Sequence, residues 1–115
     1  VTVKDEFTPS AYNDPGLAKR ATDTMADWLG RGTLIKRQPT MGGEDFGMYG
    51  RTEHKIPIFM FALGTVSTDL IKRFRAAGKP LPMVHSSTYA PDIEPSLRTG
   101  VTATAAAALD LLGKR

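Results

Sequence analysis

The chain has 115 residues, no cysteine and a formal net charge of +3. This length fits one domain at most, and a chain without cysteine has neither a disulfide framework nor a thiolate metal site. No apolar run reaches the roughly 18 residues that a membrane span needs. The start lacks both an initiator methionine and a signal-peptide pattern. We therefore expect a cytoplasmic chain that begins inside a longer protein or a processed product.

The first half of the sequence predicts a strand, a helix and two short elements. Residues 1–7 alternate apolar and polar side chains, which is typical of a strand, but no hairpin partner follows. Asp14 and then Pro15 form a good helix start, so we expect a helix over about 15–29 that stops at Gly30. We also expect a short strand at 34–35 and a short helix near 44–50.

The second half predicts a buried strand and two further helices. The segment 56–64, "IPIFMFALG", has only apolar residues from Ile58 to Leu63, which predicts a strand covered on both faces. A helix capped by Ser67 or Thr68 should continue to about Ala77. A proline-rich stretch follows, as a long ordered loop or a short strand within one. The last helix should span about 95–112, with one apolar face made of Leu97, Val101, Ala105, Ala108, Leu109 and Leu112.

This alternation of strands and helices predicts an α/β layered sheet. The sheet would be incomplete, because two or three strands cannot cover the faces of four helices. An entirely apolar central strand also requires neighbouring strands that this sequence does not contain.

The chain has two histidines in different settings. His54 lies among charged residues and before a proline, which is typical of a surface turn. His85 lies between an apolar segment and a run of hydroxyl residues. A neutral imidazole there suits a metal ligand or a general acid or base, whereas the plain alternative is a loop histidine bonded to nearby backbone.

The stretch 41–50, "MGGEDFGMYG", places two glycines before two carboxylates. Glu44 and Asp45 would diverge by about 100 degrees on a helix, so they make a poor acid–base pair. One acid would cap the short helix while the other points into a cleft. Gly42 and Gly43 would let the backbone approach a ligand closely, and their amides suit an anionic group. The alternative is a plain turn followed by a helix cap.

Other kinds of site find no support in the sequence. It contains no nucleophile elbow, no HExxH, no Walker motif and no GxGxxG pattern. A two-metal site needs more ligands than this chain offers, so further ligands would have to come from outside it. One basic group is best explained as the solvated face of a helix, and we expect no nucleic-acid partner; it comprises Lys72, Arg73, Arg75 and Lys79.

Three segments together resemble one enzyme family. They are "PTMGGEDFGMYG", "IPIFMFALGT" and "LPMVHSSTYAPDIEPSLRTGVTATAAAALDLL", in this order. They are similar to the C-terminal end of bacterial metal-dependent amidohydrolases, the group of hippurate hydrolase, N-acyl-amino-acid amidohydrolase and indole-acetyl-amino-acid hydrolase. These belong to the aminoacylase–carboxypeptidase type of metallopeptidases. The stretch "EFTPSAYNDPGLAKR" also resembles the point where the family's chain crosses from its inserted domain back to its catalytic domain. The resemblance therefore covers essentially the whole chain.

The resemblance implies a fold and a domain boundary. The family has a layered α/β, zinc-peptidase-like catalytic domain that is interrupted by an α+β lid domain, through which many members dimerise. Residues 1–9 would then be the last strand of the lid and the crossover, and residues 10–115 the C-terminal part of the catalytic domain. Phe46 and Tyr49 would anchor the Gly-rich stretch in the core.

The resemblance also implies a site. His85 matches the family's C-terminal metal-ligand histidine, although Ser86 and Ser87 follow it where proline is common. Gly42, Gly43 and Glu44 would line the substrate cleft. The other ligands and the general base would lie upstream, so this chain would hold no catalytic base. Two divalent ions (zinc, manganese, cobalt or nickel) would activate a water that cleaves an N-acyl amino acid.

A second hypothesis is that the chain is a non-catalytic binding or assembly module. It would keep the family framework without a complete metal site, in agreement with its single credible ligand, His85. Under the first hypothesis the chain is an inactive fragment of a hydrolase, and the complete enzyme forms a homodimer or higher oligomer, with no membrane partner.

Overall fold

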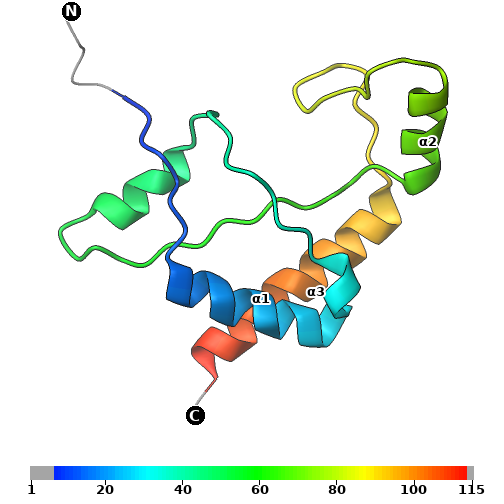
Figure 1. Ribbon diagram of the computed structural model, residues 1–115. Coiled ribbons are helices and arrows are strands. Elements are labelled where there is room, and N and C mark those ends of the chain that lie inside the picture. The colour runs from blue at the N-terminus through cyan, green and yellow to red at the C-terminus, as the bar shows by residue number, and fades with distance from the viewer. Residues whose placement is uncertain (1–6, 114–115) are drawn as a thin grey trace, which may run out of the picture.

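The computed structural model describes residues 7–113 and contains helices joined by long extended segments (Figure 1). The helices are α1 (Pro15–Leu29), α2 (Thr68–Ala76) and α3 (Ile93–Leu112). Two 3₁₀ helices, η1 (Arg31–Thr33) and η2 (Asp45–Arg51), lie between α1 and α2. Within residues 7–113 there is no strand, so the predicted α/β sheet is wrong for this part of the chain.

The start and end of α1 follow from its sequence. The Asp14 carboxylate accepts a hydrogen bond from the Leu17 N–H at 2.7 Å, and Pro15 follows at the first helical position. Gly30 ends the helix with φ of 89°, and its N–H donates to the Ala26 carbonyl. The predicted bounds of this helix are confirmed.

The helix α2 also begins and ends at the predicted residues. The Ser67 hydroxyl accepts from the Leu70 N–H at 3.3 Å. At the other end, Gly78 has φ of 63°, and the Lys79 N–H donates to the Phe74 carbonyl at 3.0 Å. This six-to-one bond beyond a left-handed glycine is a Schellman motif, which satisfies carbonyls that the helix leaves free.

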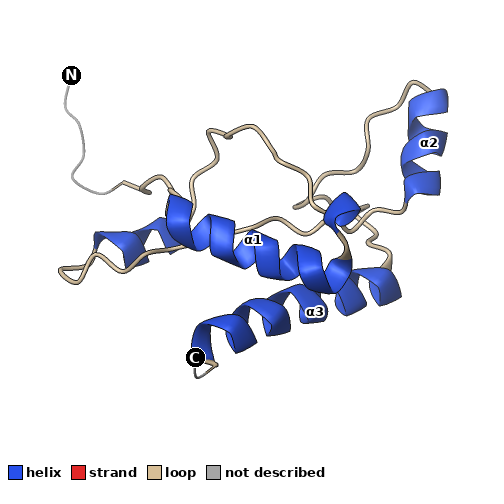
Figure 2. Ribbon diagram, turned by 60° about the horizontal axis from the view of Figure 1, so that its bottom comes forward, coloured by secondary structure: helices blue, strands red, loops and turns tan. Residues whose placement is uncertain are grey.

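The small core lies where α1 packs along α3 (Figure 2). Its members are buried apolar residues of both helices and one residue of the segment between them: Ala21, Met25, Ala26, Ile58, Ala103 and Ala106. Arg20 joins the helices at their rim, because its Nε lies 2.5 Å from Asp110 Oδ2 and its Nη2 donates to the Asp110 carbonyl. A cation near the C-terminal end of α3 also interacts favourably with the helix dipole.

The predicted strand 56–64 is an extended segment without a partner strand. Asn13 binds it from one side: the Met60 N–H donates to Asn13 Oδ1 and Asn13 Nδ2 donates to the Met60 carbonyl, both at 2.8 Å. The Asp14 N–H donates to the Ile58 carbonyl at 2.9 Å. Ile58 is buried, but Phe61 is 41% exposed, so the expected cover on both faces is wrong. No neighbouring strand within residues 7–113 is present to supply that cover.

Other strand predictions have different outcomes. Residues 34–35 form an exposed loop, so a strand there is wrong. The first predicted strand, 1–7, falls outside the described residues except for Phe7, which is exposed and not in a strand. The proline-rich stretch 79–92 is a loop with turns, as one of the two alternatives expected.

The chain is flat and open for its length. Its extents are 51 × 49 × 21 Å and its radius of gyration is 17.1 Å, against about 13 Å for a compact domain of this size. It exposes 9856 Å², whereas a folded monomer of 12.5 kDa exposes about 6,200 Å². No helix within residues 7–113 combines the length and the apolar composition required to cross a membrane.

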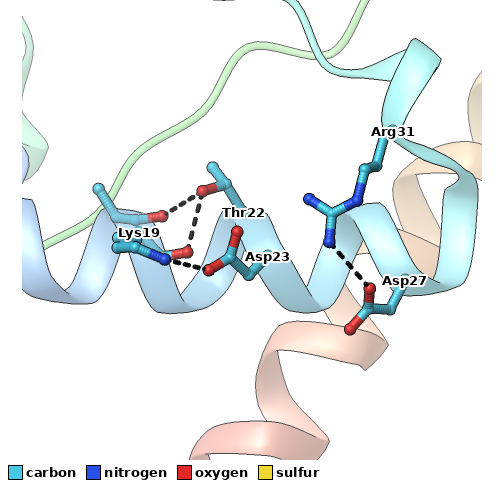
Figure 3. A network of polar contacts seen from close by, with 6 residues as sticks. Lys19, Thr22, Asp23, Asp27 and Arg31 are labelled. Carbon is cyan, nitrogen blue, oxygen red and sulfur yellow. Dashed lines mark hydrogen bonds and ion pairs between the residues drawn. The ribbon is translucent and has the colours of Figure 1, made fainter.

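The outer face of α1 carries a row of exposed ion pairs (Figure 3). Lys19 Nζ lies 2.6 Å from Asp23 Oδ2, and Arg31 Nη2 lies 3.7 Å from Asp27 Oδ1. The hydrogen bond and charge of Lys19 lower the pKa of Asp23, and Arg31 adds a smaller effect in the same direction. Exposed pairs at this spacing stabilise a helix only slightly.

We expect Lys19→Gln to raise the pKa of Asp23 towards its ordinary value, measured by NMR titration of the carboxyl group. Arg31→Gln is the control and should change it much less, because Arg31 is the smallest cause. A lowered folded-state pKa means that the pair stabilises the fold above the unfolded pKa and that this contribution is lost as pH falls through the folded pKa. An unchanged Asp23 pKa in Lys19→Gln would contradict this assignment.

Gly47 should not tolerate a side chain. A Cβ added there would lie 2.7 Å from the Ser10 carbonyl oxygen, in a buried contact of backbone against backbone. We expect Gly47→Ala to destabilise the chain by about 1–3 kcal/mol in urea unfolding. Gly64→Ala is the control, since nothing lies within 4 Å of its added Cβ. Equal unfolding midpoints for the two variants would refute the close approach.

Candidate functional site

His85 lies in the loop 79–92 at a backbone position that few residues other than glycine adopt. Its φ is 69°, and the residue is exposed. It is the third residue of a turn that is closed by the Ser86 N–H donating to the Met83 carbonyl at 3.2 Å. A second turn follows, closed by the Tyr89 N–H donating to the Ser86 carbonyl at 3.1 Å. A left-handed residue with a Cβ costs about 1–3 kcal/mol, and such residues concentrate at functional sites.

Hydroxyl groups hold the turn that follows His85. Ser86 Oγ accepts from the Thr88 N–H at 3.2 Å and lies 2.9 Å from Thr88 Oγ1. The hydroxyl run in the sequence therefore shapes the backbone around the histidine.

The end of the loop is tied to Thr65. The Tyr89 hydroxyl is hydrogen-bonded to Thr65 Oγ1, and the Asp92 N–H donates to the Thr65 carbonyl at 2.7 Å. The Ser96 hydroxyl reaches the same carbonyl at 3.5 Å. Thr65 thus joins the extended segment, the loop and the first turn of α3. Our sequence reasoning missed both Thr65 and Tyr89, because a bond between residues 24 positions apart leaves no local pattern.

The glycines of the stretch 41–50 serve packing as well as flexibility. A Cβ on Gly43 would lie 3.1 Å from Thr8 Cγ2, so the connector before α1 passes directly over this residue. Gly42 is exposed and has only Thr40 Oγ1 within reach of an added Cβ, at 3.9 Å. Gly42 therefore keeps an accessible backbone, whereas a side chain at Gly43 would press against the Thr8 side chain.

The two acids of this stretch have separable roles. The Glu44 carboxylate accepts from the Phe46 N–H at 3.2 Å and caps η2, which confirms that one acid caps the short helix. Asp45 begins η2 and is exposed. Phe46 is half-buried with its ring 5.5 Å from that of Tyr49, but Tyr49 is 61% exposed, so its expected anchoring in the core is wrong.

The structure does not bring the predicted site residues together. In Figure 1 the loop before α3 lies beside α2, while the segment that leads into η2 lies in the opposite half of the molecule. His85 belongs to the first of these segments, and residues 42–44 belong to the second. Across residues 7–113, no group of three histidine, aspartate or glutamate side chains could hold a metal ion. His54 is exposed in a turn, 3.4 Å from Glu53, as expected.

Two shallow cavities flank the tied end of the loop. One, of about 180 Å³, lies between α2 and the loop and is mostly apolar; it is lined by Val66, Leu70, Phe74, Pro82, Thr88, Tyr89 and Ala90. The other, of about 270 Å³, lies where α2 and α3 begin and is rich in hydroxyl groups. His85 lines neither of them.

In comparisons with protein-family models, curated proteins and solved structures, the chain matches none. The geometry above therefore has to support a function without help from a relative.

The hydrogen bond between the hydroxyl groups of Tyr89 and Thr65 leads to a testable prediction. We expect Tyr89→Phe to speed amide hydrogen exchange in the loop roughly fivefold, because the lost hydrogen bond is worth about 1 kcal/mol. Tyr12→Phe is a matched control, since Tyr12 is 73% exposed. Unchanged exchange at Ser86 and Tyr89 in the Tyr89→Phe variant would show that the tie does not order the loop.

Proposed function

We propose that this chain is the C-terminal portion of a metal-dependent amidohydrolase that cleaves the amide bond of N-acyl amino acids, and that His85 supplies one metal ligand. The observation that carries the proposal is the backbone of His85. An exposed imidazole is held in a left-handed conformation at the third position of a turn, on a loop that is hydrogen-bonded to Thr65. The order and spacing of the three resembling segments give the reaction class.

The position of His85 suits a ligand that meets a metal from outside the chain. A neutral imidazole coordinates zinc, manganese, cobalt or nickel, and an exposed ring is free to turn towards a site on another segment. The strained backbone supports a role other than packing, since His85 contributes nothing to the core. In this role His85 fixes an ion in place and transfers no proton.

His85 fits only part of a metal site. Catalytic zinc sites use three protein ligands and keep one open position, whereas residues 7–113 offer no cluster of three. The remaining ligands and the general base are therefore assigned to other parts of the complete enzyme. Two bound divalent ions would lower the pKa of a water and stabilise charge on the carbonyl oxygen of the substrate.

The backbone at Gly42 would take part in substrate binding. Its exposure leaves room for an anionic group such as the carboxylate of an N-acyl amino acid. Gly43 and Glu44 would contribute by setting the conformation of this stretch. Gly43 leaves space for the segment before α1 at Thr8, and Glu44 caps η2. These residues would join His85 only in an assembled site, because in this chain they lie apart.

The open surface favours a second candidate, a non-catalytic binding or assembly module. The chain exposes about 3,700 Å² more than a compact monomer of its mass, which exceeds the roughly 800 Å² that each partner buries in a standard protein–protein interface. The two candidates differ in bound metal. A hydrolase should contain about two ions per site and a binding module none.

The decisive test compares the two histidines in the complete enzyme. We expect His85→Ala to lower the hydrolysis of N-benzoylglycine by roughly a hundredfold or more, since even outer partners of metal ligands are worth tenfold to a hundredfold. It should also lower the metal content, and the fold should remain, because the residue is exposed. His54→Ala is the matched control and should keep full activity. Full turnover in His85→Ala, or hydrolysis that survives metal removal, would end the proposal.

A further inference from the structure

The helix α3 has two faces with different residues. The face on α1 carries small side chains, among them the buried Ala103 and Ala106. The opposite face is exposed and carries the large ones: Ile93, Leu97, Val101, Leu109 and Leu112. Our sequence reasoning predicted one apolar face for this helix, and the structure leaves the large residues of that face exposed. We call one row of this helix the aliphatic stripe: Leu97, Val101, Ala105, Ala108 and Leu112. Ala105 is half-buried and the other four are exposed.

The aliphatic stripe is continuous along the helix. Its members are three or four residues apart, which places them in one row. Leu97 is 63% and Val101 67% exposed, although both are apolar. The N-terminal half of the stripe is large, whereas the centre of the C-terminal half is small, at Ala105 and Ala108.

This division of sizes makes the stripe complementary to itself in the antiparallel direction. When a second α3 is laid antiparallel with the midpoints at 102–103 together, Leu97 of one helix faces Ala108 of the other and Val101 faces Ala105. Leu97 and Val101 then each meet an alanine, and each such contact occurs twice, as two-fold symmetry requires. Leu112 lies opposite Ile93 at both ends of the pair. A parallel arrangement would instead place Leu97 against Leu97 and alanine against alanine.

The distribution of charge along α3 and the exposed area of the chain are both compatible with an antiparallel pair of α3 helices. From Thr99 to Leu109 the helix has no charged residue. Glu94 and Arg98 pair with each other at 2.8 Å. The chain as a whole exposes about 3,700 Å² more than a compact monomer, whereas a standard interface buries roughly 800 Å² per partner. Because α1 covers the other face of α3, it would not obstruct a partner on the stripe.

We propose that the aliphatic stripe is an interface between two copies of this chain, with the two α3 helices antiparallel about a two-fold axis near residues 102–103. The dimer has four central helices in the order α1, α3, α3 and α1. This inference is independent of the proposed function, because His85 and its loop lie outside the stripe.

The first experiment measures the mass of the 115-residue chain by light scattering over a concentration series. The chain should approach twice its mass of 12.5 kDa. Val101→Glu should return it to the single-chain mass, because the added charge would be buried at the interface, with an unchanged far-ultraviolet circular dichroism spectrum. Ile35→Glu is the matched control: Ile35 is an equally aliphatic residue, 84% exposed and outside α3, so this variant should remain a dimer.

The second experiment uses the absence of cysteine to determine the orientation. A mixture of Leu97→Cys and Ala108→Cys chains should form mixed disulfides on mild oxidation, and neither variant alone should. In the antiparallel pair, equivalent positions at 97 lie about 16.5 Å apart along the axis, as do those at 108, which is beyond the reach of a disulfide. A monomer at all concentrations, a dimer indifferent to Val101→Glu, or crosslinking of Leu97→Cys with itself would overturn the proposal.

Discussion

The contact between α1 and α3 is the constraint on which the rest of the described chain depends. It is made by alanines and one methionine, so the two helices come close together without large interdigitating side chains. The ion pair of Arg20 with Asp110 sets their relative position at the rim, where both side chains are partly buried. The segment 56–65 is attached to this pair at two points: Ile58 lies in the core, and a Cβ on Gly100 of α3 would lie 3.1 Å from Leu63 Cδ2.

The segment 56–65 shows how an apolar sequence can be extended without forming a sheet. Its partners are polar groups at two points: the amide of Asn13 binds both backbone groups of Met60, and the region before α3 binds Thr65. The Asn13 side chain replaces part of what a neighbouring strand would provide. A single side chain covers one residue, however, and leaves Phe59 and Phe61 stacked on each other with their rings 6.0 Å apart. The hydrophobic pattern therefore predicted the extended backbone correctly and the cover incorrectly.

The sequence could predict the features that depend on local interactions, but not those that depend on residues distant in the chain. The bounds of α1 and α2 could be predicted from the sequence, because the residues that begin and end these helices act on backbone groups within one turn. These residues are Asp14, Gly30, Ser67 and Gly78. The capping of η2 by an acid, which is Glu44, could be predicted for the same reason. A sheet, in contrast, depends on partners distant in the sequence, and the residues between 7 and 113 contain none for the segment 56–64. At the candidate site, the exposure and the loop setting of His85 could be read from its neighbours, but not the tie between Tyr89 and Thr65.

The orientation of α3 carries the most physical information about what surrounds the chain. A helix normally buries its larger apolar side chains, because each is worth about 1.5–3 kcal/mol when removed from water. Here α3 buries alanines on α1 and leaves its leucines and a valine in solvent. The exposed leucines and the valine do not contribute this free energy until another surface covers the outer face of α3. Because the α1 contact already satisfies the small face, the stripe can be covered without disturbing the core, and a chain that keeps its larger apolar surface outside its own core is organised for association.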